Sequence, residues 1–532
     1  MLGLFTKKPD HPLFDLDETA RQLGELPQDD ARKALGDLTF WLESLPAAAG
    51  FTPEMRSAVL LRVDEAAQPL CLELLQRYLE EPHLRDFQGT HQWRALHDLA
   101  QALATAWSAC LEECLHSDKR PRELDERLPL LCVRQQLAVA LLLKLLLMRY
   151  LDIPANAWRQ LYAGYRAAET LGCHEQMVLA YPGHVIHTSP QRELLRTLAL
   201  YVAAPETLAA DQIEVCQRIA GRLSSFFDLA TSASVHPYQF DLESAAAPQH
   251  TDTQSVATPG TRYFATHRAQ PALHKIITQN EDDPVWRERR FGSEFTPAGK
   301  LTVLKHLLRY WAAEPPQRHL ERRGIHAEVE VVHGFRLLSQ LVPHIDAGQE
   351  AEQQAGALGL VATDKIEYTP ERWAVSDMSA GGLGAVLSGA QGAWIKIGDL
   401  CGIRPPNGGQ WWIGMLRRLH TDDAGKVHVG IELLSKRPAS VWLRVLGKGA
   451  ERSSNWETSS GSFAYDYLPV ILLPDEHNSY LHATLLLESG KFVADSYHQM
   501  MMGAQTRDIQ LTALLAEGED FEQASFAWQA AG

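Results

Sequence analysis

The hydrophobic pattern of this chain changes its period part-way along, and that change constrains the fold more than any other feature. From about Asp15 to Ala230, apolar residues recur at helical spacing, and Pro and Gly punctuate the segments as helix ends require. After Glu314-Pro315-Pro316 the pattern alternates, as in Ala327-Glu328-Val329-Glu330-Val331. A chain with both periods contains at least two kinds of domain, one helical and one built of β-strands.

The first part of the chain predicts long helices joined by short connections. Such helices pack as antiparallel neighbours, so we expect a bundle or a solenoid. The most apolar run, residues 137–148, is interrupted by Lys144 and is too short to cross a bilayer. We therefore expect a buried core helix there and no membrane span. The predicted helices are residues 31–45, 55–80, 92–116, 128–151, 155–171 and 212–229.

The predicted fold class is α+β multidomain: an N-terminal all-α bundle or solenoid-like region, then an antiparallel β-barrel, then a second small β-rich C-terminal domain. Residues 241–262 turn to Ser, Ala, Thr, Gln and Pro, which is typical of a linker. The expected domains are an all-helical domain (1–240), this linker (241–262), a mixed, helical connector (263–316), the barrel (317–448) and the β-rich domain (449–532).

Charge and cysteine usage restrict the partners and the compartment. The formal net charge of −16 argues against a broad surface for a nucleic-acid polymer or an anionic membrane, but not against one small anionic ligand held by local arginines. Seven cysteines without C-x-x-C spacing predict reduced thiols, hence a cytoplasmic protein. Residues 1–8 carry their charge after a short apolar patch, the wrong order for a signal peptide.

The sequence contains no constellation that demands catalysis. Cys110, Cys114 and His116 are close together on one predicted helix, but without a second cluster buried thiols are expected there rather than a metal site. His, Ser and Asp residues are scattered, and no nucleophile–base spacing recurs. We therefore predict a protein that is not an enzyme, with no cofactor and no metal.

One short stretch combines an acid, a hydroxyl and glycines between two apolar runs. In Asp377-Met-Ser379-Ala-Gly-Gly382, the flanking segments read as strands and the glycines as a tight connection. Such a corner presents the carboxylate of Asp377 and the hydroxyl of Ser379 at one end of a sheet, where glycine permits close approach of a ligand. The two side chains can alternatively cap a hairpin.

A basic cluster precedes the first alternating strand: Arg318-His-Leu-Glu-Arg322, followed by Arg323. By itself it could be a solvated turn. Together, R-x-x-x-R before the first strand and D-x-S-x-x-G on the next two resemble the signatures of the PilZ domain, a bacterial six-stranded barrel. Gly398-Asp399, Met415-Leu416-Arg417 and Val429-Gly430-Ile431-Glu432-Leu433 echo the family's later strands. The resemblance covers about a quarter of the chain.

The resemblance implies a receptor for cyclic di-GMP. Arg318 and Arg322 would clamp phosphate and guanine edges, Asp377 and Ser379 would read guanine, and Gly382 would shape the turn. Arg forks bind phosphate in a bidentate manner and also reach guanine O6 and N7, while a carboxylate accepts from guanine N1 and N2. Arg323 offers a second register, so the roles of the adjacent arginines stay open.

The function implied is a cytoplasmic bacterial cyclic di-GMP effector that regulates a protein partner through its helical domain, in motility, type IV pili, biofilm or exopolysaccharide production. The gap between Arg322 and Asp377 exceeds that of a minimal barrel of the family, which predicts a partly helical insertion at about 338–365. The alternative is a degenerate barrel that binds no nucleotide and belongs to a scaffold acting through its helical domain.

Overall fold

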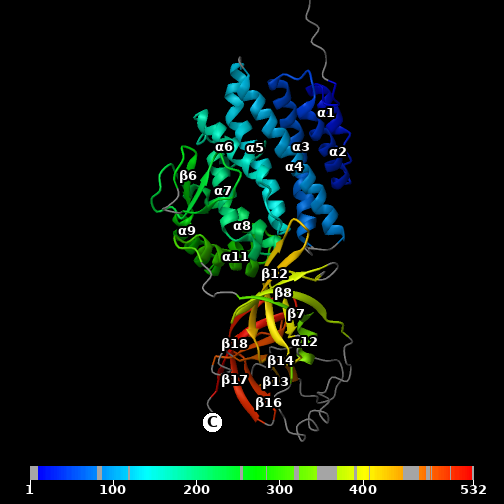
Figure 1. Ribbon diagram of the computed structural model, residues 1–532, viewed down its shortest axis with the longest axis vertical. Coiled ribbons are helices and arrows are strands. Elements are labelled where there is room, and N and C mark those ends of the chain that lie inside the picture. Colours follow the sequence, from blue (N-terminus) through cyan, green and yellow to red (C-terminus); the bar gives the residue numbers. More distant parts are fainter. Residues whose placement is uncertain are drawn as a thin grey trace, which may run out of the picture. The chain divides into compact units, whose positions relative to one another are not determined.

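The computed structural model divides the chain into two compact units, residues Met1–Gln317 and Arg318–Gly532 (Figure 1). It describes the whole chain except residues 1–9, 81–86, 118–119, 252–255, 283, 317–322, 344–367, 389–391, 393, 406–407, 447–466, 475–479, 481, 504 and 530–532. The first unit is mainly helical, and the second consists of β-barrels. The predicted α+β multidomain class is therefore confirmed.

The helical unit is built on long α-helices with a shared apolar core. Three helices begin after residues of the kind preferred as N-caps. The side chains of Asp15, Asp30 and Ser189 each accept a hydrogen bond from the backbone of the helix that they precede. The α-helices are α1 (Leu16–Gly24), α2 (Ala31–Ser44), α3 (Pro53–Glu80), α4 (Phe87–His116), α5 (Arg122–Met148), α6 (Ala155–Thr170), α7 (Pro190–Val202), α8 (Ala210–Leu223), α9 (Gln270–Asp282), α10 (Pro284–Arg289) and α11 (Pro297–Tyr310). Single 3₁₀ turns lie at η1 (Leu45–Ala47), η2 (Pro205–Thr207), η3 (Ser224–Phe226) and η4 (His267–Ala269).

Helix α5 is the central element of this unit. Among the described residues it is the one helix long and apolar enough to cross a membrane, but 78% of its most apolar window is buried inside the unit. It packs against α4, α6, α7 and α8. The expectation of a buried core helix at residues 137–148 is confirmed, and Lys144 is buried there because its ammonium group bonds Glu214 of α8 at 2.8 Å.

The predicted linker at 241–262 is wrong, because this stretch helps to form a four-stranded sheet of order β3-β6-β4-β5. Tyr238, Phe240 and Phe264 are buried in the core, where the ring of Phe264 stacks on Tyr238 and meets Phe240 edge to face. This aromatic pattern outweighs the polar composition between the strands. The first 240 residues are also not all helical. The strands of this unit are β1 (Val178–Leu179), β2 (His187–Thr188), β3 (Asp228–Ala230), β4 (Tyr238–Asp241), β5 (Gln249–His250) and β6 (Thr261–Ala265).

The second unit contains two closed six-stranded barrels, of order β10-β11-β12-β9-β8-β7 and β13-β14-β15-β18-β17-β16. Numbered from its own first strand, each barrel has the same strand pairings, so the second repeats the connectivity of the first. The strands of the first barrel are β7 (Arg323–His333), β8 (Glu371–Met378), β9 (Gly382–Leu387), β10 (Leu400–Arg404), β11 (Trp412–Thr421) and β12 (Val427–Ser435). Those of the second are β13 (Ala439–Val445), β14 (Tyr467–Leu473), β15 (Thr484–Glu488), β16 (Tyr497–Met502), β17 (Gln505–Glu517) and β18 (Phe521–Trp528).

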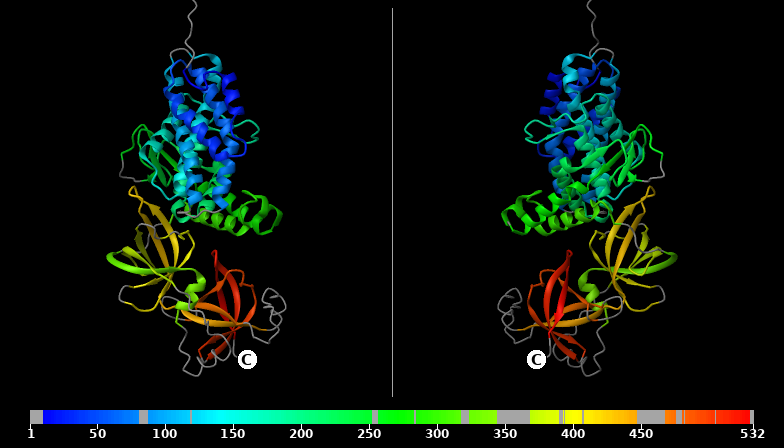
Figure 2. Two further views of the ribbon diagram at one scale, coloured as in Figure 1. Left: turned by 90° about the vertical axis from the view of Figure 1, so that its right-hand side faces the viewer. Right: turned by 90° about the vertical axis from the view of Figure 1, so that its left-hand side faces the viewer.

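The two barrels pack on each other through a short helix, α12 (Phe335–Leu341) (Figure 2). Phe335 and Leu338 join a buried apolar cluster that takes Trp411 from the first barrel and Phe521 from the second. The carboxylate of Asp520 accepts a hydrogen bond from the backbone N–H of Phe335 at 2.6 Å. The barrels therefore form one unit. Helix α12 covers the start of the insertion predicted at 338–365, and residues 344–365 lie outside the described part.

Three segments differ in the structure from what their sequence pattern or the expected domain limits indicate. Residues 394–400 alternate like a strand, but the strand begins only at Leu400, because Gly398 turns the backbone with φ +95°. Residues 439–445, assigned to the first barrel, form β13 of the second. Residues 491–494 form no strand; the next one is β16, in which Met500 and Met502 are core residues.

Asp399 lies where the first barrel approaches the second. The backbones of Gly398 and Asp399 pair with Leu416, which fixes the segment to β11. Burial raises the pKa of Asp399 to about 7; Lys396 opposes the shift, and the carboxylates of Glu519 and Asp520 add to it. The folded state therefore keeps a proton that the unfolded chain loses near pH 4.

We predict that Asp399 lowers the free energy of unfolding of the barrel unit progressively as the pH rises from about 4 to about 7. Above pH 7 the size of this penalty no longer changes. Asp399→Asn removes the penalty, so it should stabilise the protein at pH 8 by on the order of 2 kcal/mol and have little effect near pH 4. Calorimetric melting of the full chain at both pH values measures this. Asp423→Asn, on an exposed turn, is the control, and an equal gain at both pH values would contradict the prediction.

Candidate functional site

The structure places three of the six predicted site residues together on the first barrel. Asp377 lies near the end of β8, Ser379 in the β8–β9 connection and Gly382 at the start of β9. Arg318 and Arg322 lie outside the described residues. Arg323 is the first residue of β7, and its backbone pairs with Met378. The start of β7 thus lies beside the corner formed by residues 377–382.

Backbone hydrogen bonds make this corner rigid. The N–H and the hydroxyl of Ser379 both donate to the carbonyl of Gly382, at 2.8 and 3.3 Å. The N–H of Leu433 donates to the carbonyl of Gly381 at 3.0 Å, which ties the corner to β12. Ser379 thus stabilises the turn, as the hairpin-cap interpretation expected, and its hydroxyl lone pairs remain able to accept from a ligand.

Gly382 is required by a close approach of two strands. A Cβ at this position would lie 2.6 Å from the backbone carbonyl oxygen of Ile431. Because a backbone oxygen in a ladder cannot move aside like a flexible side chain, any larger residue would separate β9 from β12. The glycine is therefore a condition for barrel closure as well as for the turn.

Asp377 belongs to a row of residues that crosses the barrel wall. A bulge between Val375 and Asp377 shifts the register, so Asp377 pairs with Gly324 of β7 on one side and Gly384 of β9 on the other. Gly384 pairs with Gly430 of β12, and Gly430 with Arg418 of β11.

The side chains of this row lie on one face of the wall. A Cβ at Gly384 would be 2.6 Å from a carboxylate oxygen of Asp377, and one at Gly430 would be 3.1 Å from the Cβ of Arg418. Directly opposite residues in an antiparallel pair share a face. The side chains of Asp377 and Arg418 therefore lie on either side of two strands that carry no side chain at Gly384 and Gly430. At ordinary strand spacing, the strands that carry Asp377 and Arg418 are about 14 Å apart. We call residues 324, 377, 384, 430 and 418 the glycine row.

Four members of the glycine row were not singled out from the sequence as site residues. Gly324, Gly384 and Arg418 carry no motif signal of their own, and Gly430 was noted only as part of the Val-Gly-Ile pattern of a strand. Only strand pairing, which the sequence does not reveal, sets them beside Asp377. An alternating strand with glycine at an outward position is the local signal that could have indicated Gly384 and Gly430.

Among its described residues, the second barrel has no equivalent row. Its strands at the corresponding places, β15 and β18, contain no glycine, and Thr484 pairs with Ser525 where side chains fill the outer face. Its β14–β15 connection also lacks the D-x-S-x-x-G order. Of the two barrels, the first alone combines the corner with the glycine row.

Other candidate clusters belong to the core. All seven cysteines are buried and unpaired, Cys110 and Cys114 among them. His116 uses its ring to contact the carbonyl of Glu112. In the described part of the chain, no group of three His, Cys, Asp or Glu residues could hold a metal ion.

Comparison with known families gives two matches. Residues 17–234 match the model described as the N-terminal domain of the cyclic-di-GMP receptor FimW, and residues 458–528 match the FimW C-terminal beta-barrel domain. The chain is thus similar to FimW at both ends. The FimW matches cover most of the helical unit and most of the second barrel. In the sequence, the residues of the glycine row fall between the two matched segments. No curated protein matches the chain.

We predict that Gly382→Ala destabilises the barrel unit by on the order of 2 kcal/mol, because the new methyl group meets the backbone at Ile431. Calorimetric melting of the full chain measures the effect. Gly324→Ala is the matched control, since its Cβ would have only one neighbour, at 4.0 Å. Equal melting temperatures for the two variants would refute the close-approach argument.

Proposed function

We propose that this chain is a cytoplasmic bacterial effector that binds cyclic di-GMP at its first barrel, a PilZ-type receptor, and regulates a protein partner through its helical unit. The observation that carries the proposal is the glycine row beside the corner at 377–382. The description of FimW as a cyclic-di-GMP receptor supports the same ligand from outside this barrel.

The chemistry of the corner suits a guanine nucleotide. Guanine is planar, so its face can lie flat against a surface without side chains, and the backbone at Gly384 and Gly430 offers one. A carboxylate such as that of Asp377 accepts the hydrogens of guanine N1 and N2. Ser376 already donates to this carboxylate at 3.2 Å, which holds it on the outer face of the barrel.

The phosphates would be bound by the arginines that precede β7. Arg323 opens β7 opposite Met378, so Arg318 and Arg322 precede the strand within a few residues of the corner. Guanidinium groups bind phosphate in a bidentate manner and do not titrate at neutral pH. In this proposal the protein performs no chemistry on the nucleotide, and the resemblance implies outputs in motility, type IV pili, biofilm or exopolysaccharide production.

We predict saturable binding of cyclic di-GMP to the full chain in calorimetric titration. Asp377→Ala and Arg322→Ala should each weaken the affinity by about 10- to 100-fold, because each removes hydrogen bonds to the ligand. Asp423→Ala and Arg437→Ala, which alter exposed residues outside the corner and the glycine row, should leave it unchanged. A folded wild-type protein that binds no cyclic di-GMP would favour the scaffold alternative.

A second variant tests the glycine row itself. Gly384→Ala places a methyl group 2.6 Å from the Asp377 carboxylate, a side chain that can rotate away. We expect the affinity for cyclic di-GMP to fall by about tenfold while the melting temperature stays close to that of wild type. If Gly384→Ala binds as tightly as wild type, the ligand does not lie on the row.

A further inference from the structure

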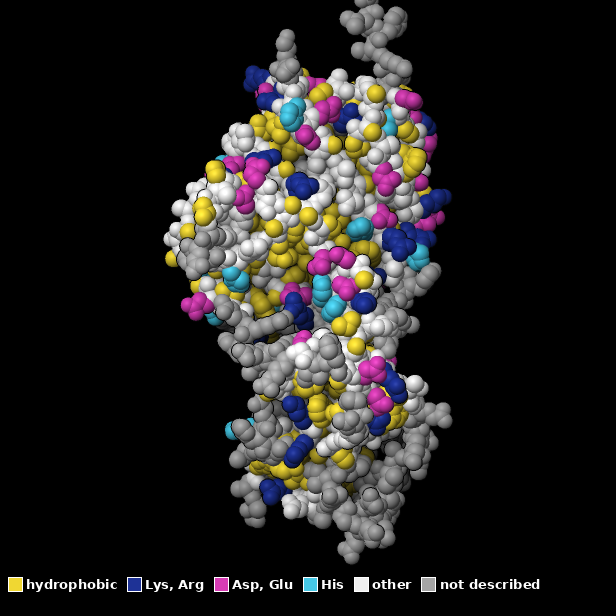
Figure 3. Space-filling view, in the orientation of Figure 1, with side chains coloured by type: hydrophobic (Ala, Val, Ile, Leu, Met, Phe, Trp, Pro, Cys, Tyr) yellow, Lys and Arg dark blue, Asp and Glu magenta, His cyan; other side chains and the backbone are white. Residues whose placement is uncertain are grey.

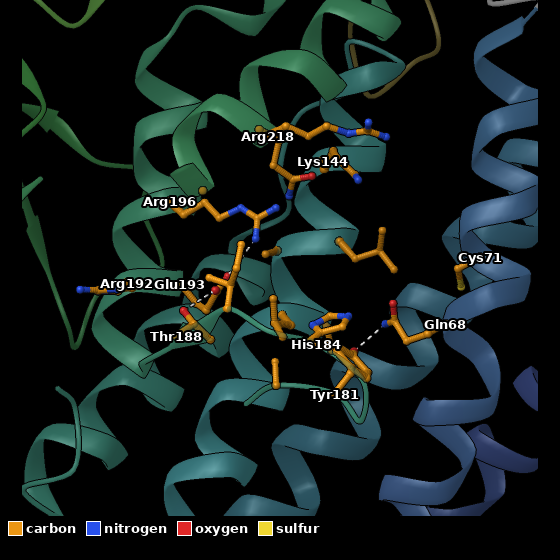
Figure 4. A pocket seen from close by; sticks show the side chains of 18 of the residues that line it. Gln68, Cys71, Lys144, Tyr181, His184, Thr188, Arg192, Glu193, Arg196 and Arg218 are labelled. Carbon is orange, nitrogen blue, oxygen red and sulfur yellow. Dashed lines mark hydrogen bonds and ion pairs between the residues drawn. The ribbon is translucent and has the colours of Figure 1, made fainter. Parts of the chain in front are cut away.

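A groove of about 550 Å³ opens on the helical unit, within the part of the chain that matches the FimW N-terminal domain. Its floor is α5, one wall is α3, and the opposite wall is formed by α7 and α8 (Figure 4). The lining includes Leu72 and Leu75 of α3, Leu137 and Leu141 of α5, and Arg196 of α7.

The floor and the α3 wall are mainly apolar, with Lys144 of α5 and Asp64 and Gln68 of α3 as the charged or polar residues among them. Leu75 is buried, but Leu72 of α3 and Ile186 of the β1–β2 loop, which also line the groove, are 60% and 62% exposed. Figure 3 shows hydrophobic side chains gathered on this face of the helical unit. Contiguous exposed apolar surface of this kind marks a place where another molecule binds.

The opposite wall is cationic. On α7 and α8, four arginines and one carboxylate, that of Glu193, line the groove, in a chain whose formal net charge is −16. The arginines form i,i+4 pairs, Arg192 with Arg196 on α7 and Arg218 with Arg222 on α8. Because this wall is positively charged while the chain as a whole is negatively charged, we expect the molecule that binds there to carry acidic groups.

The positive charges of Arg196 and Arg222 are weakly compensated by the described carboxylates, so they are available to a partner. The guanidinium of Arg196 packs over Gly221, its Nε is buried without a hydrogen-bond partner in the described structure, and its one ion pair, with Glu193, is long at 3.4 Å. Arg222 is exposed, and no described carboxylate forms a salt bridge with it. By contrast, Arg218 is already held by Glu214 and Glu294.

The end of the groove is fixed in place. The hydroxyl of Tyr181 donates to buried Asp64 at 3.1 Å and accepts from Gln68 at 2.5 Å. The guanidinium of Arg134 stacks on the Tyr181 ring at 3.6 Å and bonds both Asp64 and the carbonyl of Ala180. The loop that carries Ile186 is therefore anchored to α3 and α5, and a ligand would meet a preformed surface.

We propose that this groove binds an acidic amphipathic helix of a partner protein, with its apolar stripe on α5 and its carboxylates toward Arg196 and Arg222. The long walls of the groove are helices whose backbone groups are already paired, so they offer an extended peptide few hydrogen bonds, whereas a helix satisfies its own. The lining residues 137–145 of α5 span about 12 Å, enough for two turns. The proposal specifies the partner half of the proposed function and rests on it, but it does not depend on nucleotide binding.

The test is a displayed library of helical peptides of about 16 residues, with an apolar stripe and with flanking positions drawn from Glu, Lys, Gln and Ser. The library is selected for binding to the full chain, with and without cyclic di-GMP. The affinity of the best peptide is then measured by fluorescence anisotropy for wild type, Leu72→Ser, Arg196→Glu/Arg222→Glu and the control Arg159→Glu, which alters an exposed residue of α6 outside the groove.

The proposal expects peptides with Glu enriched on one flank. Arg196→Glu/Arg222→Glu should weaken the best peptide by about tenfold or more and bind its Lys-substituted counterpart better than wild type does. Leu72→Ser should also weaken it, whereas Arg159→Glu should not. Melting temperatures equal to that of wild type show that the variants are folded.

Several outcomes would overturn the proposal: no peptide selected, neutral or basic flanks enriched, or equal affinity for the double variant. A concentration-dependent dimer of wild type that is lost in Arg196→Glu/Arg222→Glu would assign the groove to a second copy of the chain instead. Because peptide binding is measured apart from the nucleotide titration, failure here is distinct from failure of the proposed nucleotide site.

Discussion

Closure of the first barrel is the constraint on which the candidate site depends. To close, β9 must pair with β12 and β10 with β7, so that no strand is left with an unpaired edge. The β9–β12 contact is so close at Gly382 that a Cβ would meet the Ile431 carbonyl. The same pairings put Gly384 beside Gly430 and the start of β7 beside Asp377. The surface proposed to bind the nucleotide is therefore a direct consequence of how the barrel is closed.

The two barrels show how one connectivity can be used in two ways. The first has a bare outer row with a carboxylate at one end and an arginine at the other, while the second fills the corresponding strands with side chains. Helix α12 and the cluster around Trp411 and Phe521 join them into one apolar core. In this arrangement the second barrel supports the first, since it supplies Asp520 to cap α12 and buries that helix's apolar face.

The helical unit buries cationic side chains, although the chain as a whole is acidic. Lys144 is buried and bound to Glu214, and Arg134 is buried and bound to Asp64, so these cations stabilise the helix packing. Among the arginines that line the groove over α5, Arg218 is likewise held by two carboxylates, whereas no described carboxylate forms a salt bridge with Arg222. The proposed nucleotide site and the proposed helix-binding groove lie on separate units, and a ligand-controlled adaptor needs two such distinct surfaces.

The sequence by itself determined the two fold classes, the buried character of α5 and the corner at 377–382, because hydrophobic period and turn chemistry are local properties. It could not determine the sheet at 238–265, where a few aromatic residues outweigh a polar composition, or the boundary of β13, which alternates equally well in either barrel. The bulge at Asp377, the glycine row and the groove over α5 were decided only by the tertiary structure. Each depends on which strands or helices become neighbours, and long-range pairing leaves no mark on the local pattern of residues.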